Sequence, residues 1–153
     1  MKTKLKTAYM KTAETFAELS HARRLHVGAI VVKDDRIISI GYNGMPAGWD
    51  NNCEDESVEL YSGFEGAIHR TVLKTKPEVL HAETNAIAKL ARSTESGLGA
   101  DIFITHAPCL DCAKLIYQSG ISRVFYGENY RDDAGIKFLR QSGLTVEQIE
   151  KDS

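Results

Sequence analysis

The sequence predicts an α/β fold in which a mixed sheet carries helices on its faces. Near the start, two β-rich runs flank a short turn, which indicates a hairpin of antiparallel strands. After residue 80, helical patterns alternate with short apolar runs, as in strands joined by crossover helices. A length of 153 residues suits one domain, so we expect a single domain over residues 1–153.

The first half of the chain is predicted to hold a helix, the hairpin and a long loop. Apolar residues recur at helical spacing over residues 3–20. Residues 27–32 and 36–42 are the β-rich runs, and "KDD" supplies the turn between them. Residues 43–80 are expected to form a regulatory or insertion loop, because the segment opens with many Gly, Asn, Pro and Asp residues. A short helix is predicted inside this segment, within residues 61–78.

The second half is predicted to alternate between helices and strands. The helical patterns cover residues 82–92, 109–118 and 132–142. The strands "DIFIT", "RVFYG" and "LTVEQI" cover residues 101–105, 123–127 and 144–149. The order of these strands in the sheet does not follow from the pattern.

Composition narrows the classes of function. A net charge of −2 does not favour a nucleic-acid partner, which usually requires a basic surface. No apolar run approaches the roughly 20 residues of a membrane span, and no apolar run follows the basic N-terminus as in a secretory signal. Three cysteines, two of them in C-x-x-C, argue against a disulfide framework and for a reduced, cytoplasmic setting.

Two predicted helix starts carry residues typical of a zinc site. Cys109 and Cys112 are three apart, so on a helix they share one face. Pro108 is predicted at the first helical position, which places both cysteines in the first turn, where the helix dipole favours thiolates. His81 precedes the other helix. Two thiolates and one imidazole balance Zn²⁺ and leave its fourth position for water, as in catalytic zinc sites.

Glu83 indicates which chemistry this zinc would serve. It lies two residues from His81, so it can sit beside the water without binding the metal. H-x-E together with P-C-x-x-C is the signature of zinc nucleobase deaminases. Two alternatives stay open: a redox C-x-x-C pair, and a closed structural zinc site whose fourth ligand would be Cys53, His69 or His106.

Longer motifs resemble those of deoxycytidylate (dCMP) deaminases, a branch of the cytidine deaminase superfamily. The similar segments include "GYNGMPAG", "HAETNAIAKL" and "PCLDCAKLIYQSGI", and the resemblance extends from about residue 8 to about residue 145. It implies a three-layer α/β/α sandwich with a mixed five-stranded sheet, and hydrolysis of dCMP to dUMP and ammonia for thymidylate synthesis. It also implies one catalytic zinc per chain, a hexamer, activation by dCTP with Mg²⁺ and inhibition by dTTP.

The resemblance also assigns roles to individual residues. His81, Cys109 and Cys112 match the zinc ligands, and Glu83 matches the residue that protonates ring nitrogen 3 and then the leaving amino group. The residues implied for substrate binding are Ser20, Arg24, Asn43, Ala82 and Tyr130. Those implied for the regulatory nucleotide are Gly41, Asn43, Gly44 and Trp49.

The chain departs from the family pattern at one place. Several members hold a second, structural zinc through two cysteines, and this chain has Cys53 but carries Ala22 where the other is expected. His69 and Glu54 could contribute, yet one thiolate makes a poor structural site, so we predict a single zinc. Rival functions are a free-cytidine deaminase, a tRNA adenosine deaminase, a riboflavin-pathway deaminase and a non-catalytic zinc module.

Overall fold

The computed structural model describes residues 1–63 and 66–150, and its strands and helices confirm the α/β prediction. Within these residues, five strands form a mixed sheet in the order β2-β1-β5-β6-β7, and β3 pairs with β4 in a separate hairpin. Strand β1 lies antiparallel to β2 and β5, whereas β5, β6 and β7 run parallel. The elements are α1 (Thr3–Ala17), β1 (Gly28–Lys33), β2 (Arg36–Tyr42), β3 (Glu54–Gly63), β4 (Gly66–Thr75), α2 (Ala82–Ala91), β5 (Asp101–His106), α3 (Leu110–Gln118), β6 (Arg123–Glu128), α4 (Ala134–Gln141) and β7 (Thr145–Gln148).

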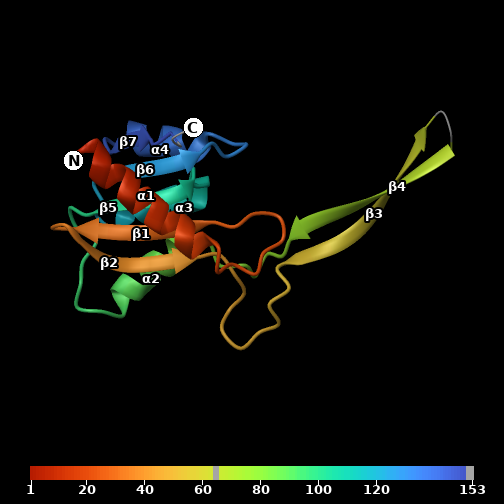
Figure 1. Cartoon of the computed structure of the whole chain (residues 1–153), viewed down its shortest axis with the longest axis horizontal. Helices are drawn as coiled ribbons and strands as arrows, with labels where there is room; N and C mark the ends of the chain where they lie inside the picture. Colours follow the sequence, from red (N-terminus) through yellow and green to blue (C-terminus); the bar gives the residue numbers. More distant parts are fainter. Residues whose placement is uncertain (64–65, 151–153) are drawn as a thin grey trace.

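Helices cover both faces of the sheet, which gives the predicted three layers (Figure 1). On one face, α1 packs Met10 against Ile30 and Phe103. On the other face, α2, α3 and α4 bury their apolar side chains against alternate residues of the same strands, such as Val31 and Ile102. Successive strand residues point to opposite faces, so the continuous apolar runs in β1 and β5 supply both cores.

Local signals in the sequence account for most element boundaries. The β1–β2 turn has positive φ at Asp34 (52°) and Asp35 (56°), the backbone of the tight hairpin turns that short polar residues favour. Helix α1 ends at Ala17, before the predicted residue 20, where the chain turns toward the sheet. None of the helices in the described part of the chain has the length and apolar character that a membrane crossing requires.

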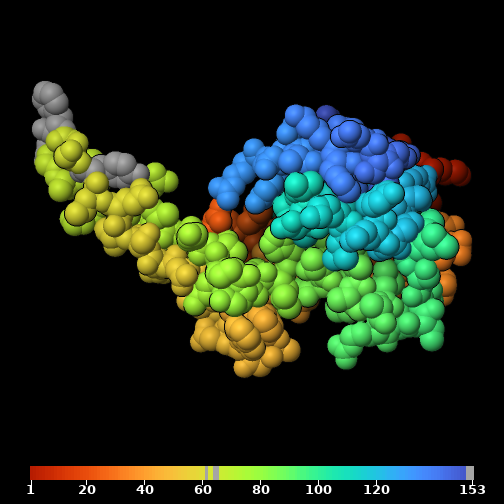
Figure 2. Space-filling model, turned by 180° about the vertical axis from the view of Figure 1, so that it is seen from behind, coloured from red at the N-terminus to blue at the C-terminus, as the bar shows by residue number. Residues whose placement is uncertain are grey.

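The prediction for residues 43–80 was wrong over much of its length. Residues 54–63 and 66–75 form the β3–β4 hairpin, which extends from the body as an arm (Figures 1 and 2). Strand therefore replaces the predicted short helix over residues 61–63 and 66–75, and a turn follows at residues 77–78. Residues 64 and 65 lie outside the described residues. The second strand contains the β-branched residues Ile68, Thr71, Val72 and Thr75, a composition that favours strands over helices.

A close contact between β2 and α2 determines how near the second helix lies to the sheet. Gly41 is buried, and a Cβ atom there would lie 2.3 Å from the carbonyl oxygen of Ala82 and 2.7 Å from the amide nitrogen of Ala86. Any side chain at this position would push α2 away from the strand. The glycine therefore places the start of α2 against the end of the hairpin.

Candidate active site

The predicted ligands lie at the starts of two neighbouring helices. His81 is the N-cap of α2, and Cys109 is the N-cap of α3. The prediction that Pro108 opens the second helix was wrong, because Cys109 keeps an extended backbone (ψ 169°) and α3 begins at Leu110. Cys112 is consequently the third helical residue, still within the first turn.

The three ligand atoms converge to the spacing that zinc requires. The His81 Nδ1 atom lies 3.2 Å from Cys112 Sγ and 3.7 Å from Cys109 Sγ. Tetrahedral coordination with ordinary zinc–nitrogen and zinc–sulfur bond lengths places such atoms about 3.6 Å apart. Within the described residues, these three form the metal-binding group, and the other candidate ligands Cys53, His69 and His106 lie outside it. The donor set therefore fits zinc with three protein ligands.

Hydrogen bonds among the ligands determine their protonation before metal binds. The pKa of Cys109 is lowered to about 4, first by the hydrogen bond from Cys112 and then by that from His81. The same bonds raise the pKa of Cys112, which donates to Cys109, and the pKa of His81. The metal-free site thus holds one thiolate, and binding Zn²⁺ to both sulfurs must expel the Cys112 proton.

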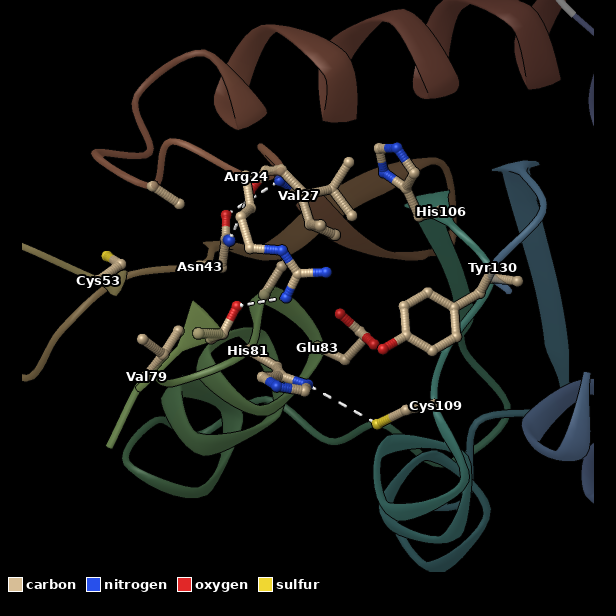
Figure 3. A pocket seen from close by; sticks show the side chains of 15 residues that line it. Arg24, Val27, Asn43, Cys53, Val79, His81, Glu83, His106, Cys109 and Tyr130 are labelled. Carbon is tan, nitrogen blue, oxygen red and sulfur yellow. Dashed lines mark hydrogen bonds between the residues drawn. The ribbon is translucent and has the colours of Figure 1, made fainter. Parts of the chain in front are cut away.

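Glu83 occupies the position expected of a proton carrier. It lies in the first turn of α2, only 4% of its surface is exposed, and it lines the pocket beside the ligands (Figure 3). Burial is the largest effect on its carboxyl group and raises its pKa. A carboxylate whose pKa is raised accepts and returns a proton near neutral pH more readily than an exposed one.

Most of the residues predicted to bind substrate line the same pocket. Arg24 and Asn43 lie on one wall, and Tyr130 lies on the opposite wall near Glu83 (Figure 3). Ala82, next to the ligand His81 in the chain, also lines the pocket. The lining residues are Ala22, Arg24, Leu25, Val27, Asn43, Cys53, Thr75, Val79, His81, Ala82, Glu83, His106, Ala107, Cys109 and Tyr130.

Ser20 and Asn43 brace the wall that carries Arg24. The Ser20 hydroxyl donates to the carbonyl oxygen of Asn43 (2.8 Å) and accepts from the amide of Ala22 (3.2 Å). Ser20 is buried and is not among the residues that line the pocket, so its predicted contact with substrate stays a prediction. The Asn43 side chain accepts from the amide of Val27 and donates to the carbonyl of Leu25, both at 2.9 Å, while it also lines the pocket.

The residues predicted for the regulatory nucleotide are spread along β2 and the loop after it. Gly41 is buried beneath α2, and its lack of a side chain is explained by packing. Gly44 pairs with Leu80 in a short β-bridge that aligns the chain just before His81. Trp49 is 54% exposed on the loop. Their roles in effector binding stay predictions.

An apolar cluster lies where the family pattern led us to look for a second zinc. Cys53 packs with Ala22 and Val79, and Met45 covers them. Burial raises the pKa of the Cys53 thiol, which disfavours the thiolate that a metal would need. His69 lies on the exposed arm opposite Leu60. Packing of apolar side chains holds this corner together.

Sequence reasoning missed Thr75 and the setting of His106. Thr75 lines the pocket and accepts a hydrogen bond from the Arg24 guanidinium, but no motif marks it in the sequence. His106 also lines the pocket, and its ring contacts Thr105 (2.9 Å) and Glu128 (3.2 Å). The pairing of β5 with β6 brings Glu128 opposite His106, which only the fold reveals.

Known proteins are similar to this chain in sequence and in fold. The model of the cytidine and deoxycytidylate deaminase zinc-binding region matches residues 3–128. The ComE operon protein 2 of Bacillus subtilis is 38% identical over 145 residues, covering 94% of this chain and 70% of that protein. The deoxycytidylate deaminase of enterobacteria phage T4 is 36% identical over 154 residues, covering 82% of this chain and 79% of that protein. The structure of the dCMP deaminase of cyanophage S-TIM5, solved with dCMP and dUMP, has 45% sequence identity to this chain and a TM-score of 0.83. The match covers 97% of this chain and 98% of that chain.

A three-layer fold with a His/Cys/Cys group beside a buried glutamate defines the class of zinc-binding deaminases. Within that class, the chain belongs to the cytidine and deoxycytidylate deaminase family, as its match over residues 3–128 shows.

We predict that zinc affinity falls as the pH is lowered, because protons compete for Cys112 and His81. Each proton displaced by the metal changes the affinity about tenfold per pH unit. A chelator competition titration of the metal-free protein between pH 8 and pH 6 measures this, with an expected stoichiometry of one zinc per chain. The variant Cys53→Ala serves as the control and should bind the same amount of zinc. An affinity independent of pH, or a loss of zinc in the control, would contradict the assignment.

Proposed function

We propose that this protein deaminates dCMP hydrolytically, giving dUMP and ammonia. The observation that carries the proposal is a single pocket lined by His81 and Cys109 of the three-ligand group, the buried Glu83 and the cationic Arg24. The ligand group and Glu83 suit hydrolytic removal of an amino group from a pyrimidine ring, and Arg24 suits a substrate with a phosphate. The names of the T4 and S-TIM5 relatives support dCMP as that substrate.

The residues of the chain divide the chemistry among them. His81, Cys109 and Cys112 would hold zinc, which when bound supplies a Lewis acid that lowers the pKa of water toward about 7. Glu83 takes a proton from the attacking water and gives it to ring nitrogen 3. After the water oxygen has bonded to ring carbon 4, Glu83 takes the remaining proton of that hydroxyl and delivers it to the amino group. The carbon–nitrogen bond then breaks, ammonia leaves and the carbonyl of the uracil ring forms. The amide of Ala82, at the first helical position, lacks an intrahelical acceptor and can donate to the ring carbonyl.

Arg24 and Tyr130 would hold the rest of the nucleotide. A guanidinium has several N–H donors in one plane and matches the oxygens of a phosphate. Arg24 extends into the pocket from the loop before β1, opposite Tyr130, whose ring lies near Glu83 (Figure 3). A substrate spanning the distance between Glu83 and Arg24 would place its base at the metal group and its phosphate at the loop.

We further propose a hexamer that is activated by dCTP with Mg²⁺ and inhibited by dTTP, with the effector bound near Asn43, Gly44 and the exposed Trp49. Asn43 supports this placement, because it lies between the pocket and the loop that carries Trp49. An effector that orders this loop would therefore act on the wall that contains Arg24.

The variant Glu83→Gln is expected to keep its zinc and lose turnover by about 10²- to 10⁴-fold, the usual contribution of a proton-transferring group. Ammonia release from dCMP and zinc content per chain are the two measurements. Glu78→Gln, an exposed glutamate before the same helix, is the matched control and should retain activity. Substantial turnover by Glu83→Gln would remove this residue from the mechanism.

Arg24→Ala is expected to raise KM for dCMP by at least about tenfold, because it removes charge-assisted hydrogen bonds to the phosphate. Turnover of deoxycytidine, which lacks the phosphate, should not change. The neighbouring Arg23→Ala is the matched control, since that guanidinium bonds Glu56 and Asn52 on the surface. An unchanged KM for dCMP in Arg24→Ala would refute the phosphate contact.

Addition of dCTP and Mg²⁺ is expected to shift the dCMP saturation curve to lower concentration, and dTTP should reverse the shift. The comparison requires initial rates over a range of dCMP with each effector, and with Mg²⁺ alone as the control. A hyperbolic curve that neither nucleotide moves would contradict the proposed regulation.

A further inference from the structure

The root of the β3–β4 arm lies against the loop that carries Arg24. Glu54, the first residue of β3, stands directly opposite Thr75, the last residue of β4. The root is closed by a hydrogen bond of 2.8 Å from the amide of Lys76 to the carbonyl oxygen of Cys53. The first and last residues of the hairpin are therefore held side by side next to the pocket.

Glu54 binds the main chain of the arginine loop. Its side chain is fully buried, with 0% exposed, and its carboxylate accepts the amide of Arg23 at 2.8 and 2.9 Å and that of Arg24 at 3.3 Å. A buried carboxylate is costly unless hydrogen bonds compensate for its lost hydration. Here the amides of two successive residues, Arg23 and Arg24, supply these hydrogen bonds. Glu54 therefore holds the backbone of the loop in place at Arg24.

Thr75 binds the side chain of the same arginine. Its hydroxyl oxygen accepts from Arg24 Nη1 at 3.0 Å, while both residues line the pocket (Figure 3). This bond uses one of the five N–H donors of a guanidinium. Arg24 is consequently held at its main chain by one residue of the cross-strand pair and at its tip by the other.

We propose that Glu54 and Thr75 are positioning residues that hold Arg24 in place for the phosphate monoester of the substrate. This inference rests on the proposed function, in which Arg24 binds that phosphate. An arginine side chain loses much rotamer freedom when it binds a ligand, and fixing it beforehand lowers this cost. The arm root is therefore a determinant of specificity for nucleotide over nucleoside, without touching the reacting atoms.

Thr75→Val tests the side-chain contact, because valine keeps the β-branched shape and removes the acceptor. We expect KM for dCMP to rise about 3- to 10-fold, the usual effect of one hydrogen bond, with kcat retained. Kinetics with deoxycytidine should not change, and Thr75→Ser should restore the KM for dCMP. Thr71→Val makes the same substitution at an exposed position of the same strand and should leave all values unchanged.

Glu54→Gln tests the main-chain contact, and it should likewise raise KM for dCMP more than KM for deoxycytidine. If this variant does not fold, Thr75→Val and Thr75→Ser still decide the inference. A normal KM for dCMP in Thr75→Val, together with a raised KM in Arg24→Ala, would overturn the positioning role and leave the phosphate contact intact. A normal KM in Arg24→Ala would refute the phosphate contact and this inference with it. No turnover of dCMP by the wild-type protein would overturn the proposed function.

Discussion

The site depends on two helices that begin at the same place on one face of the sheet. α2 and α3 contact the same apolar core as β1 and β5, and small residues such as Ala82, Ala86 and Ala113 let them approach closely. Gly41 brings α2 against β2 at the same level. Because both helices start there, their N-caps His81 and Cys109 lie close together. The metal ligands are therefore held by elements that are packed into the core.

The opposite wall of the pocket is built in a different way. Residues 18–27 contain no helix or strand, so buried polar side chains hold them in place. Ser20, in this loop, hydrogen-bonds to Asn43, and the Asn43 side chain hydrogen-bonds back to Leu25 and Val27 of the loop. Glu54, at the start of the arm, hydrogen-bonds to the amide of Arg23 in the same loop. The apolar cluster of Ala22, Cys53 and Val79 closes the corner behind this wall by packing. The wall is thus specified by hydrogen bonds that are distant in sequence.

This difference explains how much the sequence could predict. His81, Glu83, Cys109 and Cys112 follow local rules of helix starts and ligand spacing, and the structure brings all four together as expected. The arm was missed because the segment before its first strand is rich in Gly, Asn, Pro and Asp, which is typical of loops. The bonds from Arg23 to Glu54 and from Arg24 to Thr75 join residues 31 and 51 positions apart, so no local pattern could reveal them.

Two adjacent arginines show why the arm root matters for charge. Arg23 is paired with the carboxylate of Glu56, and this pairing raises its pKa and neutralises its charge toward the surface. Arg24 instead donates to the neutral hydroxyl oxygen of Thr75, and the carboxylate of Glu54 is engaged with backbone amides. A carboxylate at position 75 would hold the guanidinium as firmly but would compete with a phosphate. A neutral acceptor orients the side chain and leaves its positive charge for an anion.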